Sequence, residues 1–371
     1  MDDVAHDLSA AILNLDAALK SMTHEQIAAV VTGFANNEDT HTILSSMLVN
    51  ANIRYRNGDL LHNAAFGTEP DGIDLTSVSM PVGLVSNDGS AILGRDGFVF
   101  LTGGSNDVIG QYSPRRTGDD ELFAQWMNVI AARLDAAERA KVRFHQIVIP
   151  EKISILPELF PRPVAAPTRL LDLLESECLT RYGRTMHTSA RHLFWALPDR
   201  RRVSKRTDSH LSPFGSAVVF REIVRQLYGL KLPEFAFTEA KMAVGDLAYR
   251  MFGLFLPEIF SEVDSATMPA FVQSATKVFE AVPSHGAHMG RRQVWRNPEA
   301  PIREKVVVFG NSFFSFVENG QSNLSWWFSR WFEEYHFVWT NEVHWNYVAE
   351  VDPQLVIWQG IERFLPILPA Q

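Results

Sequence analysis

The chain has 371 residues, of which 46% are hydrophobic and 21% are charged, so it can bury a sizeable core as an ordinary globular protein. Its formal net charge of −9 argues against a general binder of nucleic-acid backbones, because that binding depends on an excess of Lys and Arg. We therefore expect no nucleic-acid partner.

The N-terminal sequence, MDDVAHDLSAAILNLDAALK, lacks the basic head and the unbroken apolar stretch of a secretory signal. No other segment offers the roughly 18 apolar residues that span a bilayer. We expect a cytoplasmic chain without a membrane span.

The N-terminal region predicts a helical leader. Apolar residues between Val4 and Leu19 recur at helical spacing, and Thr23 with Gln26 forms a capping box for a second helix. Beyond this region, short β-rich runs broken by turns appear. The sequence therefore divides into a helical segment, 1–75, and a catalytic domain, 76–371.

The catalytic domain alternates helical and strand-like patterns. Its first run, AILGRDGFVFLTGG, predicts a hairpin that turns at Asp96-Gly97, and residues 121–141 predict a helix that leads into a buried strand over 144–149. The later elements are helices over 168–182, 212–229 and about 247–260, an apolar run over 193–197, a flexible loop over 284–292, and strands over 306–309 and 355–360. This alternation favours an α/β sheet.

Ser312 is the candidate nucleophile. It lies two residues beyond Gly310, the glycine that follows the 306–309 strand, and ligands of open α/β sheets bind at the carboxyl ends of strands. A serine hydroxyl needs a base and a group that orients the base. Asp208 and His210 supply both, and in an extended segment their i, i+2 spacing puts them on one side.

Taken singly, these signals are common in proteins, but together they form a pattern. DPQLVIWQGIER resembles a conserved block of the SGNH hydrolases, in which Gly360 would be the block's glycine. In those enzymes the serine block comes first, whereas here the Asp-His block precedes it. The permuted order resembles the alginate O-acetyltransferase family. The shared blocks are Gly94–Leu101, Pro150-Glu151-Lys152, Thr207-Asp208-Ser209-His210, Gly310-Asn311-Ser312-Phe313 and Glu362-Arg363.

The resemblance covers about residues 90–365 and implies an SGNH-hydrolase-like, flavodoxin-like sheet with circularly permuted catalytic blocks. It further implies that Ser312 takes the acyl group, that His210 is the general base, and that Asp208 orients the histidine. Asn311 replaces the family's usual Asp, and Glu362 stands where SGNH hydrolases have their oxyanion asparagine. Asn311 and Arg363 are therefore candidates for oxyanion or substrate binding.

The implied function is transfer of acetyl onto a hydroxyl of a bacterial polysaccharide or glycoconjugate. It needs no bound cofactor but does need an acetyl donor, and a partner protein that delivers acyl groups is possible. Two alternatives stay open: a carbohydrate esterase with the same triad, and a non-catalytic glycan-binding protein. Exported members of the family carry a signal or membrane anchor, so localisation does not carry over.

Other chemistry-bearing residues have simpler interpretations. Cys178 sits among leucines at helical spacing and is expected in the core. His285 and His288 lack a third metal ligand, and we predict no metal site. Lys152 and Asp246 match positions that the family retains, but pairing or turn formation explains them equally well. The basic stretch of 200–206 can attract an anionic glycan or the phosphates of coenzyme A, or can be a solvated loop. The aromatic segment of 326–335 has helical spacing and is expected mostly in the core.

Overall fold

The computed structural model describes most of the chain beyond its N-terminal region. The described residues are 82–86, 88–104, 106–114, 116–252, 257–283, 288–315 and 320–369. The helical segment predicted over 1–75 lies outside them. Within these ranges, none of the helices combines the length and the apolar character that a membrane span requires.

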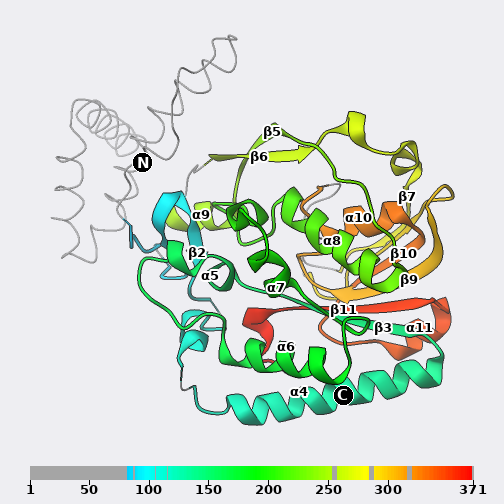
Figure 1. The fold of residues 1–371 in the computed structure, drawn as a ribbon, viewed down its shortest axis with the longest axis horizontal. Coiled ribbons are helices and arrows are strands. Elements are labelled where there is room, and N and C mark those ends of the chain that lie inside the picture. Colours follow the sequence, from blue (N-terminus) through cyan, green and yellow to red (C-terminus); the bar gives the residue numbers. More distant parts are fainter. Residues whose placement is uncertain are drawn as a thin grey trace, which may run out of the picture.

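A seven-stranded mixed sheet forms the centre of the fold (Figure 1). The strands lie in the order β4-β3-β11-β9-β10-β8-β7; the first five are parallel, and β8 and β7 are added antiparallel at one edge. Their bounds are β3 Arg143–Ile149, β4 His187–Ser189, β7 Thr276–Ala281, β8 Arg292–Arg296, β9 Ile302–Gly310, β10 Phe332–Trp339 and β11 Leu355–Ile361. The predicted α/β sheet is confirmed.

The strand order places β11 in the middle of the sheet, where it pairs with β3 on one side and β9 on the other. Counted from β9 through β10 and β11 to β3 and β4, the parallel strands follow the order 2-1-3-4-5 of flavodoxin-like sheets. β9, which leads to Ser312, thus takes the first place in that order, although β3 and β4 precede it in the sequence.

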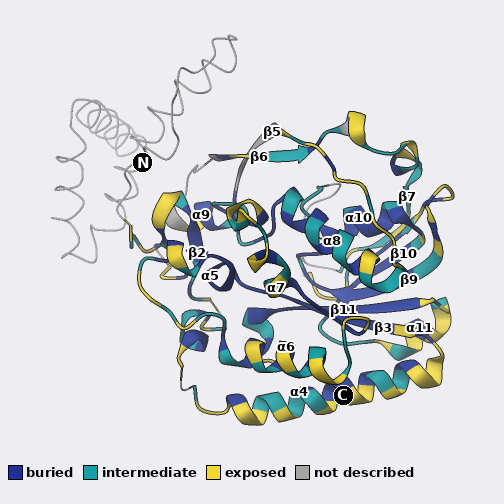
Figure 2. Cartoon of the chain, in the orientation of Figure 1, coloured by how far each residue is buried: buried dark blue, intermediate teal, exposed yellow. Residues whose placement is uncertain are grey.

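Helices cover both faces of the sheet, and the strands between them are buried (Figure 2). On β9, Val306 and Val308 join one buried cluster with α7, α8 and α10, while Val307 and Phe309 join another with α4, α6 and α11. A strand buried on both faces needs an unbroken apolar run, which is why it was predictable. The helices are α4 Asp119–Ala140, α5 Lys152–Ile155, α6 Arg169–Arg181, α7 Ala190–Trp195, α8 Pro213–Tyr228, α10 Leu324–Trp331 and α11 Trp345–Val351.

Two smaller hairpins lie outside the main sheet. β1 (Ala91–Leu93) and β2 (Val99–Leu101) pair antiparallel, and their turn has positive φ at Asp96 (56°) and Gly97 (71°), as predicted. β5 (Phe237–Val244) pairs with β6 (Pro257–Val263), and the helix α9 (Asp246–Phe252) lies between them in the sequence.

Two sequence interpretations differ from the structure, and an apolar run that had no assigned element begins as a helix. The helix predicted over 247–260 ends at Phe252, because the chain then pairs as β6 with β5. The apolar run of 193–197 begins in α7, because Ser189 caps a helix there by accepting a hydrogen bond from the amide of His192. The aromatic segment of 326–335 is helical only to Trp331 and continues as β10. Its predicted core role is nevertheless confirmed, since Trp327 and Trp331 are buried.

Candidate active site

The Asp-His block lies in a loop between a short 3-10 helix and α8. Ser204 and Leu211 form an antiparallel bridge that closes the loop, and the amide of Lys205 donates to the carbonyl of His210 at 3.2 Å. Between them the backbone bends rather than extends. Asp208 Oδ1 accepts the amide N–H of His210 at 2.8 Å, the local hydrogen bond that aspartate favours in turns.

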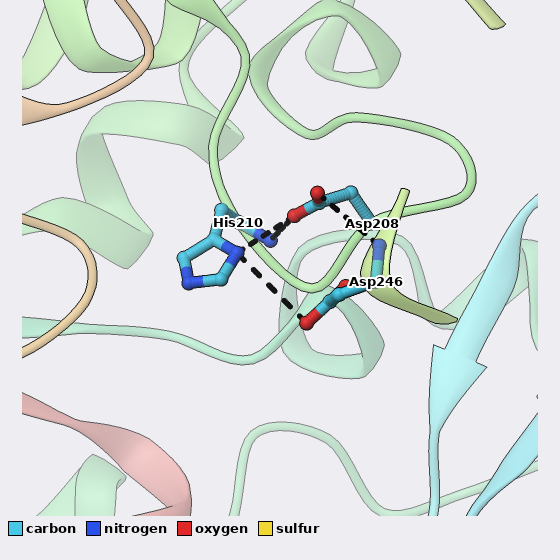
Figure 3. A group of neighbouring side chains, drawn as sticks. All are labelled: Asp208, His210 and Asp246. Carbon is cyan, nitrogen blue, oxygen red and sulfur yellow. Dashed lines mark hydrogen bonds and ion pairs between the residues drawn. The ribbon is translucent and has the colours of Figure 1, made fainter. Parts of the chain in front are cut away.

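That bend brings the two side chains together (Figure 3). His210 Nδ1 donates to Asp208 Oδ1 at 2.7 Å, and both residues are 6% exposed. Burial opposes ionisation of the carboxyl, but the hydrogen bond from His210 and the charge of Lys205 outweigh it and hold the pKa of Asp208 well below its usual range. Asp208 therefore stays ionised while it holds the imidazole.

The serine block meets this loop from the end of β9. The ring of Phe313 packs against the imidazole of His210, with the centroids 5.0 Å apart. Ser312, the residue before Phe313, is half-buried. Two blocks that lie about a hundred residues apart in the sequence are thus neighbours in the fold.

Asn311 shapes the turn that carries Ser312. Its backbone amide donates to Gln359 Oε1 at 3.1 Å, and its side-chain oxygen accepts the amide of Phe313 at 3.2 Å. The side-chain Nδ2 is buried and has no hydrogen-bond partner among the residues that the structure describes. An unused N–H donor therefore lies next to Ser312.

Arg363 occupies a different setting. Its guanidinium pairs with the carboxylate of Glu151 at 2.6 Å, and its side chain is 11% exposed. The structure thus gives Arg363 an ion-pair role at the carboxyl end of β11, and substrate binding by this residue stays a prediction.

Asp246 is a further carboxylate in the site that the sequence did not place there. Its oxygens accept the amide and the hydroxyl of Ser209, each at 2.6 Å, and its Oδ2 lies 4.0 Å from His210 Nδ1 (Figure 3). The only sequence signal was the family-like Gly-Asp-Leu. Asp246 holds the backbone between Asp208 and His210 in place and adds a second negative charge near the imidazole.

Asp208, His210 and Asp246 are also a set of side chains that could ligate a metal ion. Their candidate ligand atoms, however, are already engaged: the carboxylate of Asp208 accepts from His210, and that of Asp246 accepts from Ser209. A metal ion bound through Nδ1 would have to displace the proton that this atom donates to Asp208. The hydrogen-bonded arrangement fits proton transfer better than metal ligation.

Lys152 and Glu258 bind the backbone of the loop that carries Asp208 and His210. The ammonium of Lys152 is buried and donates to the carbonyls of Val99, Arg206 and Asp208 at 2.8, 3.0 and 2.7 Å. Burial lowers the pKa of Lys152 to about 8. The carboxylate of Glu258 accepts the amides of Arg206 and Thr207. The position of Asp208 is therefore fixed by buried charged groups.

Glu362 is a buried structural carboxylate. It accepts hydrogen bonds from the amides of Glu151 and Thr168 and from the hydroxyl of Ser154, each at 2.8 Å. Burial nevertheless raises the pKa of Glu362 to about 7, against the effect of these hydrogen bonds. Glu362 thus ties β11 to the segments after β3 and before α6.

We expect Glu362→Gln to flatten the pH dependence of stability. A carboxyl whose pKa rises from 4.5 to about 7 on folding binds more protons in the folded state, so the free energy of unfolding falls as pH rises through this window. The slope is at most about 1.4 kcal/mol per pH unit. Urea denaturation between about pH 4.5 and 7 should show this slope in the wild type. Glu138→Gln, at an exposed position, is the control and should show the same slope. Equal slopes in Glu362→Gln and the wild type would contradict the prediction.

Other candidates from the sequence have clear settings. Cys178 is buried in the core as predicted, and burial raises the pKa of its thiol to about 12. His285 lies outside the described residues, and the ring of His288 stacks on Trp339 with centroids 4.9 Å apart. Trp326 is half-buried at the edge of the aromatic cluster.

No protein-family model matches the sequence, and neither does any curated protein. The structure of Bacillus cereus PatB1 with a sulfonyl adduct matches with a TM-score of 0.51 and 12% identity, over 75% of this chain and 97% of that chain. The O-acetyltransferase domain of AlgJ from Pseudomonas putida matches with a TM-score of 0.48 and 17% identity, over 76% of this chain and 94% of that chain. The likeness to PatB1 shows a common fold.

Proposed function

We propose that the chain is an O-acetyltransferase that carries an acetyl group on Ser312, with His210 as general base and Asp208 as the residue that orients it. One observation carries the proposal. His210 Nδ1 donates to Asp208 at 2.7 Å, while the imidazole packs on Phe313, the residue next to Ser312. Because the ionised carboxylate can only accept, the Nδ1 proton is fixed and Nε2 is the atom that can take a proton from serine.

In the first step, His210 Nε2 takes the hydroxyl proton of Ser312 as Oγ bonds to the acetyl carbon of the donor. The bond from that carbon to the donor's leaving group breaks, and the leaving group departs with the proton from Nε2. Asp208 stabilises the imidazolium that forms between these events. The Nδ2 of Asn311 and backbone amides beside Ser312 are the proposed oxyanion donors.

In the second step, a hydroxyl of a carbohydrate acceptor gives its proton to His210 as its oxygen bonds to the acetyl carbon. The ester bond to Ser312 Oγ breaks, and Oγ takes the proton back. The acceptor class rests on the sequence resemblance to the alginate O-acetyltransferase family. Water in place of the sugar would make the same site an esterase, so the acceptor decides between the two activities.

Acylation of Ser312 is testable with p-nitrophenyl acetate and intact mass spectrometry. We expect an adduct of about +42 Da in the wild type and none in Ser312→Ala or His210→Ala. Ser315→Ala is a matched control, since Ser315 lies in the same turn but donates to Gln293. Added oligosaccharides should then collect the acetyl group. Release as acetate alone would favour the esterase, and a folded wild type that forms no adduct would favour a non-catalytic glycan-binding protein.

A further inference from the structure

A pocket of about 560 Å³ lies beside the Asp208–His210 loop. Its walls come from the turn between β1 and β2, from the basic segment 199–206 with the start of α8, and from β6. Lys205 joins the pocket to the active site, because it lines the pocket while its Nζ lies 3.6 Å from Asp208 Oδ2. A ligand in this pocket would therefore lie one side chain away from Asp208.

Four basic side chains line the pocket, in a chain with a net charge of −9. Arg201 is engaged by Asp96 at 2.9 Å, and Lys205 faces Asp208. Arg202 and Arg206, in contrast, make no ion pair within the described part of the chain. Two guanidinium groups at the pocket thus retain hydrogen-bonding capacity for a ligand.

Aromatic rings support these two guanidinium groups. Arg202 lies 4.1 Å from the ring centroid of Phe214, and Arg206 lies 5.8 Å from that of Phe98. Both phenylalanines also line the pocket. Stacking restricts a guanidinium to fewer orientations while its N–H edges stay available, so less conformational freedom is lost when an anion binds.

The acidic residues at the pocket have other partners. Asp96 pairs with Arg201, and Asp199 accepts the amide of Arg201 at 3.1 Å. The carboxylate of Glu258 accepts the amide and the hydroxyl of Thr207. The lining acids are therefore occupied by groups of the protein, which leaves Arg202 and Arg206 to set the preference of the pocket for anions.

We propose that this pocket binds the phosphate groups of the acyl donor, a thioester of the coenzyme A type. Paired guanidinium forks match the geometry of phosphate oxygens, and the pocket volume falls within the range of small-molecule sites. Phe98, Phe214 and the half-exposed Ile259 provide apolar walls for the uncharged part of the ligand. This inference rests on the proposed function, since it supplies the donor for Ser312. In the acylation step, Ser312 Oγ bonds to the thioester carbon, the C–S bond breaks, and the thiol leaves with the proton from His210.

Calorimetric titration with coenzyme A and with pantetheine, which lacks phosphate, tests the site. We expect coenzyme A to bind the wild type, pantetheine to bind much more weakly, and Arg202→Gln/Arg206→Gln to weaken coenzyme A binding about 10- to 100-fold. The double variant Arg139→Gln/Arg181→Gln removes the same charge from exposed positions on α4 and α6 and should bind coenzyme A as the wild type does. Equal losses of coenzyme A affinity in the two double variants would mean that net charge alone causes the effect, which would overturn the proposal.

Further outcomes separate the pocket from the catalytic proposal. Binding of inorganic pyrophosphate without binding of coenzyme A would overturn the donor assignment. Acetylation of Ser312 by p-nitrophenyl acetate, together with no binding of coenzyme A, would refute the pocket but not the proposed function. Binding of coenzyme A that depends on Arg202 and Arg206, without acylation of Ser312 by any donor, would support the pocket and refute the proposed function.

Discussion

Asp208→Asn is expected to lower kcat for release of p-nitrophenolate from p-nitrophenyl acetate by about 10⁴-fold, the loss known for this substitution in serine triads. The asparagine amide can donate to His210 Nδ1, which would place the imidazole proton on Nε2. Nε2 would then be unable to accept the proton of Ser312. Circular dichroism should be unchanged, because asparagine has the size of aspartate and because Lys152 and Asp246 keep their hydrogen bonds to the backbone of the loop.

Asp246→Asn is the matched control for this prediction. Asp246 lies 4.0 Å from His210 Nδ1, beyond hydrogen-bond distance, so it acts on the imidazole through charge. A partly exposed charge at this distance contributes about 1–2 kcal/mol, so a loss of roughly tenfold is expected. Equal losses in the two variants would mean that both carboxylates orient the histidine, and a larger loss in Asp246→Asn would assign the orienting role to Asp246.

Lys152→Met should be strongly destabilising. The substitution keeps the apolar stem but removes the ammonium that donates to the carbonyls of Val99, Arg206 and Asp208. Leaving buried acceptors unsatisfied costs about 1–3 kcal/mol each, and Arg206 keeps a second donor, the amide of Val99. We expect the free energy of unfolding to fall by about 3 kcal/mol in urea titrations.

Lys231→Met provides the comparison, because Lys231 is exposed and its substitution should change the unfolding free energy by less than about 0.5 kcal/mol. If Lys152→Met also changed the free energy of unfolding only a little, the gain from no longer burying a charge would have offset the lost hydrogen bonds. The ammonium would then not be needed to hold the loop. Acylation of Ser312, measured below the unfolding transition, would then stay at the wild-type rate.

The parts of this fold that the sequence predicted are those set by local patterns. The unbroken apolar run of Val306–Phe309 identified β9, and Asp96-Gly97 identified the turn of the first hairpin. The pairing of Asp208 with His210 was also local, since it depends on a bend within three residues. Each of these signals needs no knowledge of the rest of the chain.

The remaining features depend on contacts between distant segments. Asp246 approaches His210 from the start of α9, and nothing in its own sequence surroundings shows that approach. β10 follows a helix without a turn signal, so its aromatic residues were read as helical. The sequence also could not show that Asp96, in the hairpin of β1 and β2, pairs with Arg201. It therefore could not show which cations of 200–206 have no acidic partner.

The central place of β11 also has a consequence for biosynthesis. β3 and β9 are both neighbours of β11, which the ribosome makes after every other strand of the sheet. A nascent chain that has reached only β10 exposes two unpaired strand edges where β11 will insert, and such edges are prone to aggregation. Productive folding of the sheet must therefore wait until β11 has been made, and Ser312, which follows β9, acquires its rigid support only at that stage.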